Sequence, residues 1–93
     1  MALISFINES AGVFKQRAVV SILSAQPTSP TIGDYYILGS SPTGAIWGSY
    51  RENELVLWDG SSWAKQSPAY PTVVFIESYN SLYYFDGTAW RAL

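Results

Sequence analysis

Two carboxylates stand at equivalent places in this chain and could carry out acid–base chemistry. Asp59 and Asp86 each precede a glycine, and each Asp-Gly pair is followed by two small residues and a Trp. A pair of carboxylates can act as general acid and nucleophile, as it does in glycosidases. Asp before Gly is also a favoured β-turn sequence, in which the carboxylate bonds the local backbone. Because each Asp is tied to its own Gly, the sequence favours the turn role.

Other side chains that catalysis commonly uses are missing from the sequence. The chain has no His and no Cys, which removes the commonest general base, the commonest metal ligand and any thiolate. Ser61 and Ser62 follow Asp59 without a His that could activate them as nucleophiles. The sequence therefore predicts a protein that is not an enzyme, with no catalytic residue, no metal site and no cofactor.

The Asp-Gly pairs belong to a longer repeated phrase. Leu55–Trp63 (LVLWDGSSW) returns as Leu82–Trp90 (LYYFDGTAW). Each copy is a β-favouring run, a turn in which Gly accepts a positive φ, and a Trp suited to anchor the core of a hairpin. The phrase thus predicts two similar hairpins, with turn and anchor roles for Asp59, Gly60, Trp63, Asp86, Gly87 and Trp90.

The remaining sequence indicates more short strands. β-favouring runs alternate with loops rich in Pro, Gly and Ser, and no helical periodicity is evident. About seven short strands at hairpin spacing are typical of an all-β domain. We expect a small antiparallel sandwich or barrel built from β-hairpins over residues 17–93. The predicted strands are 17–23, 35–38, 54–58, 62–66, 72–78, 81–85 and 89–93.

Residues 1–16 do not follow this strand pattern. Their apolar side chains fit neither a helix nor a strand, which predicts an N-terminal arm. The arm could add an edge strand to its own domain, or it could dock onto another protein. The candidate docking residues are Leu3, Ile4, Phe6, Ile7, Val13 and Phe14.

The strands carry apolar residues on both faces. In Leu55–Trp58 both alternating sets are apolar, whereas a sheet with one buried face alternates apolar and polar residues. Charged residues make up only 13% of the chain. Surplus apolar surface of this kind predicts burial between subunits, for which we expect a homotrimer, or exposure for binding. Tyr50, Tyr70 and Tyr79 lie in predicted loops and are candidate contact aromatics.

The charge pattern narrows the class of partner. The net charge is −2 and the five basic residues are scattered, so nucleic-acid binding is not expected. Arg51–Glu54 holds the densest charge and is expected at a solvated hairpin tip. The N-terminus lacks a basic region, and no apolar run approaches the roughly 20 residues of a membrane span. We expect no export signal and no membrane insertion.

Taken in order, the motifs resemble a phage domain family of unknown biochemical function. Pro27–Ile37 (PTSPTIGDYYI) is similar to that family's PPxSPxxGDxYIV opening, and Thr43–Trp47 (TGAIW) is similar to its TGAW element with one residue inserted. Trp58–Trp63 resembles its WDGxxW element, and Leu82–Trp90 resembles its final strand and turn. The resemblance extends from Arg17 to the C-terminus.

The resembled family occurs in the tail and tail-fibre proteins of tailed phages and in gene-transfer particles. The resemblance therefore implies a virion protein of the tail region, made in the host cytoplasm. The expected function is a structural or interaction component of the tail, baseplate or fibre, acting as a trimeric adaptor or fibre module. Its partners would be itself and other virion tail or fibre proteins. The alternative is a receptor-binding module that recognises host cell-surface glycans.

Overall fold

The computed structural model describes residues 18–93, which form short strands and 3-10 turns. These residues hold no α-helix, so the all-β prediction is confirmed. No helix within them is long and apolar enough to cross a membrane. The strands are β1 (Ala18–Val19), β2 (Ser21–Ala25), β3 (Tyr35–Thr43), β4 (Leu55–Trp58), β5 (Trp63–Gln66), β6 (Val73–Ile76), β7 (Ser81–Phe85) and β8 (Trp90–Ala92), and the 3-10 turns are η2 (Trp47–Ser49) and η3 (Glu77–Tyr79).

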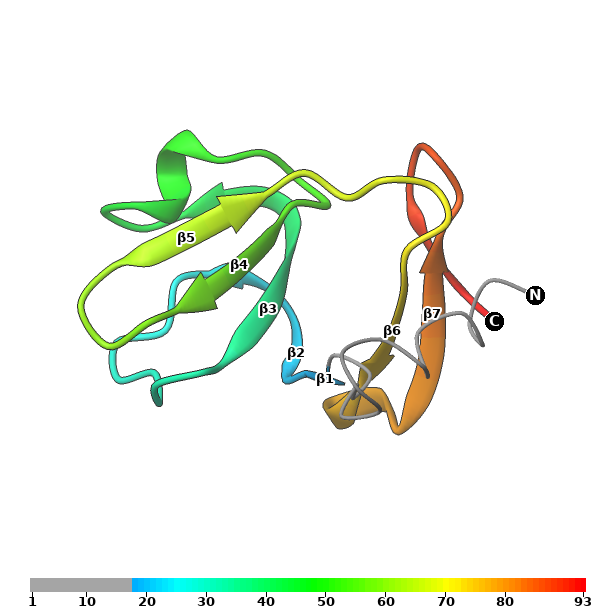
Figure 1. Ribbon diagram of the computed structural model, residues 1–93. Helices are drawn as coiled ribbons and strands as arrows, with labels where there is room; N and C mark the ends of the chain where they lie inside the picture. The colour runs from blue at the N-terminus through cyan, green and yellow to red at the C-terminus, as the bar shows by residue number, and fades with distance from the viewer. Residues whose placement is uncertain (1–17) are drawn as a thin grey trace.

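The strands form two four-stranded sheets that lie side by side in Figure 1. Sheet I has the order β2-β3-β4-β5, and sheet II has the order β1-β6-β7-β8. Each sheet is an antiparallel meander of three strands with one parallel strand added at its edge. The sheets are therefore mixed, where the sequence predicted purely antiparallel pairing, and among residues 18–93 they do not close into a barrel.

The two parallel edge strands come from one predicted strand, which divides at Val20. The Val20 N–H donates to the Tyr35 carbonyl in sheet I over 2.8 Å, and the Val20 carbonyl accepts the Ser78 N–H beyond β6 over 3.0 Å. β1 consequently pairs with β6, and β2 pairs with β3. After β2 the loop 26–34 returns the chain to the start of β3, which makes this pair parallel.

The two sheets repeat each other in register as well as in strand order. In the repeated hairpins, the cross-strand pair of Trp58 and Trp63 is equivalent to the pair of Phe85 and Trp90. The same alignment continues through the preceding strand and the parallel edge strand, beyond the repeated sequence phrase. The pairing of Ile37 with Leu55 in sheet I is equivalent to the pairing of Phe75 with Leu82 in sheet II. The pairing of Ile22 with Ile37 is likewise equivalent to that of Ala18 with Phe75.

The main core lies between the two sheets. Its buried residues come from β1 and β6 of sheet II and from β3 and β4 of sheet I. Burial of apolar side chains from both sheets is the main stabilising contribution expected in such a sandwich. The core residues are Val19, Ile37, Leu55, Val74 and Ile76.

A second cluster covers the other face of sheet I. It consists of Tyr36, Leu38, Val56 and Trp63 on the strands and Trp47 in η2, all buried. The segment 44–50 thus covers the second apolar face of β3 and β4 from within the chain. The two-faced pattern that led us to expect subunit contacts has an intramolecular cause in sheet I, and the homotrimer stays a prediction.

Candidate functional site

Asp59 closes the turn between β4 and β5. Its Oδ1 accepts the backbone N–H groups of Ser61 and Ser62, each over 2.8 Å. The Ser61 hydroxyl donates to Oδ1 and the Ser62 hydroxyl donates to Oδ2, each over 3.2 Å. The backbone hydrogen bonds, from Ser61 first and then Ser62, lower the pKa of Asp59. Gly60 supplies the expected positive φ of 104°, so the carboxylate is engaged in the turn.

Asp86 repeats this arrangement between β7 and β8. Its Oδ1 accepts the N–H groups of Thr88 and Ala89 over 2.8 Å, and Gly87 has a φ of 105°. Arg91 Nε donates to Oδ2, and this contact, followed by the backbone bonds, holds the pKa of Asp86 well below its usual range. The two turns belong to different sheets and lie far apart in Figure 1, so the carboxylates do not meet as a catalytic pair.

The two repeated tryptophans anchor different parts of the structure. Trp63 is buried in the cluster on the outer face of sheet I, where its ring centroid lies 5.2 Å from that of Trp47 and 5.1 Å from that of Trp58. Trp90 packs against the core between the sheets, and its indole N–H donates to the Asn53 carbonyl over 2.9 Å. Equivalent positions therefore serve an outer cluster in one sheet and the inter-sheet core in the other.

A pocket of about 380 Å³ opens beside the outer cluster of sheet I. Three elements form it: the loop after β2, the segment that carries η2, and the β4–β5 hairpin. Aromatic rings and prolines dominate its walls, as in most small-molecule sites. The rings are those of Tyr50, Trp58 and Trp63, and the prolines are Pro27 and Pro30.

Gln26 fixes the segment that forms one wall of the pocket. Its Oε1 accepts the backbone N–H groups of Ile46 and Trp47, over 2.9 and 3.0 Å. Gly44 allows this contact, since it has a φ of 128° and an added Cβ would lie 2.5 Å from the Gln26 Cβ. Gln26 and Gly44 together hold Trp47 against the sheet and Ile46 at the pocket.

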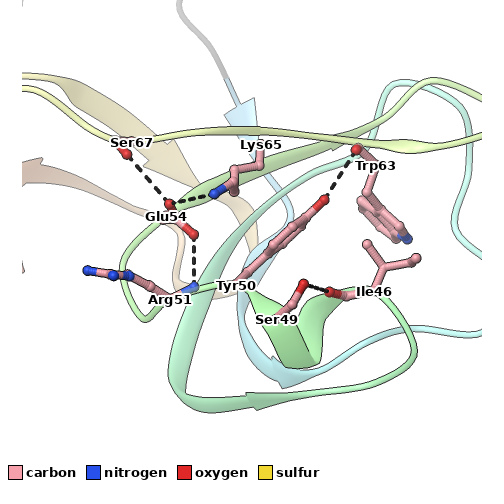
Figure 2. Close-up of polar contacts among 8 residues, drawn as sticks. All are labelled: Ile46, Ser49, Tyr50, Arg51, Glu54, Trp63, Lys65 and Ser67. Atoms are coloured by element: carbon pink, nitrogen blue, oxygen red, sulfur yellow. Dashed lines mark hydrogen bonds and ion pairs between the residues drawn. The ribbon is translucent and has the colours of Figure 1, made fainter.

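Polar contacts orient Tyr50 at the pocket, as Figure 2 shows. The Tyr50 hydroxyl donates to the Trp63 carbonyl over 3.5 Å, and Lys65 Nζ lies 5.2 Å from the Tyr50 ring centroid. Glu54 Oε2 lies 3.5 Å from Lys65 Nζ, and Glu54 Oε1 accepts the Arg51 N–H over 2.8 Å. Glu54 is only 6% exposed, which corrects the expectation that the whole cluster 51–54 is solvated.

Hydroxyl groups supply the polar rim of the pocket. Ser61 and Ser62 line it, and both of their O–H groups are directed to the Asp59 carboxylate. Each serine oxygen keeps acceptor capacity, because a hydroxyl has one donor and two lone pairs. None of the lining residues is charged. The pocket thus suits a neutral ligand with an apolar face and hydroxyl donors at its edge.

Of the three predicted contact aromatics, the structure places only one beside the other aromatic residues of the pocket. Tyr50 lines it, whereas Tyr70 is 67% exposed on the loop before β6 and Tyr79 is 46% exposed in η3. Sequence reasoning did not single out Trp58 as a pocket residue, although its pairing with Trp63 follows from the hairpin. The predicted docking residues of the arm, Leu3, Ile4, Phe6, Ile7, Val13 and Phe14, lie outside the described residues.

Comparison with known proteins identifies a family but no characterised relative. A family model described as a protein of unknown function (DUF2793) matches residues 12–91. No curated protein and no solved structure matches the chain. Within residues 18–93, no group of three acidic side chains forms a candidate metal site.

Proposed function

The chain belongs to the DUF2793 family of proteins of unknown function, and we propose that it is a non-catalytic module that binds a neutral sugar in the pocket of sheet I. The observation that carries this proposal is an uncharged pocket of about 380 Å³ walled by Tyr50, Trp58 and Trp63. Aromatic rings offer a flat apolar surface on which the C–H face of a sugar ring can stack. The pocket volume falls within the range of about 300–1,000 Å³ that is common for small ligands.

The serine rim supports a ligand that carries hydroxyl groups. Because Asp59 accepts the O–H groups of Ser61 and Ser62, the serine oxygens are oriented as acceptors for ligand hydroxyls. An anionic ligand would approach the ionised Asp59, and the like charges would repel each other. The turn that the sequence predicted for structural reasons therefore gains a second role, since it orients the polar edge of the pocket.

The resemblance to phage tail and tail-fibre domains supports a setting for this module. In that setting the chain is a component of the tail, baseplate or fibre of a virion, and its ligand is a host cell-surface glycan. Sugar binding by a small domain of this kind is weak at a single site and is strengthened when several copies act together. A trimeric assembly on the virion would supply such copies.

A structural adaptor is the second candidate function. Large apolar side chains are exposed on two loops away from the cores, with Ile32 72% exposed and Tyr70 67% exposed. Such residues suit contacts with sister subunits or other virion proteins. Light scattering at micromolar concentration tests the assembly: this candidate requires a mass near that of a trimer, and a stable monomer contradicts it.

A glycan array followed by titration tests the sugar-binding proposal. We expect the purified chain to bind neutral oligosaccharides, Trp58→Ala to reduce binding at least tenfold, and Tyr70→Ala, a matched aromatic outside the pocket, to leave binding unchanged. Circular dichroism checks that both variants are folded. Ser62→Ala, at an exposed position of the pocket rim, is a second variant of the pocket. Lack of binding to every glycan, or pocket-dependent binding of a proline-rich peptide instead, would overturn the proposal.

A further inference from the structure

The side-chain amide of Gln26, which lines the pocket of sheet I, can face only one way. Its Oε1 accepts the backbone N–H groups of Ile46 and Trp47, over 2.9 and 3.0 Å. If the amide were reversed, these two donors would face an amide nitrogen, which donates hydrogen bonds and does not accept them. The backbone of the segment 44–50 therefore fixes the orientation of the amide, and the Gln26 Nε2 is directed away from Ile46 and Trp47.

The Gln26 Nε2 group has two N–H donors that the fold leaves unused. Within residues 18–93, the only hydrogen bonds of the Gln26 side chain are the two accepted by Oε1. Gln26 is half-buried, yet its Nε2 still reaches solvent, because Trp47 Nε1 is the one sealed and unpartnered side-chain atom in this part of the chain. An oriented donor without a protein partner, on a residue that lines a pocket, is available to a ligand.

The pocket places this donor among apolar side chains and the hydroxyl groups on a different element. Pro27 follows Gln26 directly in the loop after β2, and Ile46 is held by the Gln26 amide itself. Ile46 is 44% exposed although it is apolar. Ser61 and Ser62 belong to the β4–β5 hairpin. A matching ligand therefore carries an acceptor next to an apolar group, and hydroxyl donors elsewhere.

We propose that the sugar bound in this pocket is an N-acetylated hexosamine and that Gln26 selects it, an inference that rests on the function proposed above. An acetamido group combines a methyl group with a carbonyl oxygen, which accepts hydrogen bonds and donates none. The Gln26 Nε2 donates to this oxygen, and the methyl group packs on Pro27 and Ile46. A plain hexose has only a hydroxyl at that position, so it leaves the apolar surface uncovered.

Two matched pairs of sugars test this preference on the full chain. The methyl glycosides of N-acetylglucosamine and glucose differ only at C2, as do those of N-acetylgalactosamine and galactose. In titrations followed by tryptophan fluorescence, we expect at least one N-acetylated sugar to bind about tenfold more tightly than its plain partner, through one more buried methyl group and a better acceptor. Equal binding within both pairs would overturn this inference and leave sugar binding intact. Failure of every sugar to bind would overturn the proposed function as well.

Gln26→Glu tests the donor while it keeps the acceptor. The carboxylate retains an oxygen for the Ile46 and Trp47 N–H groups, but the oxygen that replaces Nε2 cannot donate. We expect this variant to bind the N-acetylated sugar about tenfold more weakly and the plain hexose within about threefold of the unmodified chain. Gln66→Glu, the same change of charge on β5 outside the pocket, should keep the preference. A preference that survives in Gln26→Glu would overturn the role of Gln26.

Ile46→Ala provides a second variant, whose outcome does not depend on the Gln26 amide. The Ile46 side chain is 44% exposed, so its truncation leaves the cores intact, and circular dichroism checks the fold of all three variants. Loss of the apolar contact should reduce binding of the N-acetylated sugar by about threefold or more and leave binding of the plain hexose unchanged. An equal loss for both sugars would show that Ile46 does not contact an acetyl group and would overturn the assignment.

Discussion

The indole N–H of Trp90 donates to the backbone carbonyl of Asn53 over 2.9 Å. Trp90 begins β8 in sheet II, and Asn53 lies in the turn before β4 of sheet I. A second bond runs the other way along the same junction, since Asn53 Nδ2 donates to the Thr88 carbonyl over 3.1 Å. The second hairpin is therefore fastened to the first sheet by polar contacts as well as by the apolar core.

Trp90→Phe should weaken this junction. The variant keeps an aromatic ring against the core but loses the donor to Asn53, so we expect a loss of about 0.5–1.5 kcal/mol in the free energy of unfolding. Chemical denaturation followed by circular dichroism measures it. An unchanged free energy of unfolding would show that the bond contributes nothing to the attachment of the two sheets.

Gly87→Val should destabilise the second hairpin through the backbone alone. Gly87 has a φ of 105°, and an added Cβ would meet no atom within 4 Å. A β-branched residue disfavours this conformation, so the expected cost is about 1–3 kcal/mol. At Gly60 the same change adds a contact of 3.1 Å with Ile32, and Gly60→Val should cost more. Thermal melts show which of the two variants is less stable. A Gly87→Val protein as stable as the unmodified chain would contradict the turn assignment.

The turn carboxylates should make stability depend on acid pH. Hydrogen bonds lower the folded-state pKa of Asp59 and Asp86 below the unfolded value of about 3.9. Their contribution is therefore fully present above the unfolded pKa and is lost as the pH falls through the lowered folded values. We expect the melting temperature to decline below about pH 4, with a smaller decline in Asp86→Asn. An identical decline in that variant would contradict the role given to Asp86.

Gly44→Ala should damage the pocket while the two sheets remain paired. The added Cβ would lie 2.5 Å from the Gln26 Cβ, and the side-chain amide of Gln26 holds the segment that carries Ile46 and Trp47. We expect native-like strand content by circular dichroism but loss of sugar binding. Gly48→Ala is the matched control, because a Cβ there would have no atom within 4 Å. Full binding by Gly44→Ala would contradict this role for the segment.

Local features of the fold could be predicted from the sequence, because hairpins are encoded by neighbouring residues. The Asp59 and Asp86 turns and the positive φ values of Gly60 and Gly87 follow from short motifs. The division of one strand at Val20 between two sheets depends on distant partners, Tyr35 and Ser78. No motif within the strand specifies such partners, so the parallel edges were not predicted.

The pocket depends on tertiary packing in the same way. Trp63, which the sequence predicts as a hairpin anchor, is buried. The contact between Trp63 and Trp47 requires the segment 44–50 to fold back over sheet I. The burial of Glu54 likewise follows from its bond to Arg51 and its proximity to Lys65 across the sheet. Charge density alone indicated solvent exposure for this residue.

The indole N–H signals of the four tryptophans give the most direct test of sugar binding. Trp58 and Trp63 line the pocket, whereas Trp90 lies against the core between the sheets. In an NMR titration with the best neutral oligosaccharide from the array, we predict saturable shifts of the Trp58 and Trp63 signals and a constant Trp90 signal. Unchanged Trp58 and Trp63 signals at saturating sugar would contradict the assignment of this pocket as the binding site.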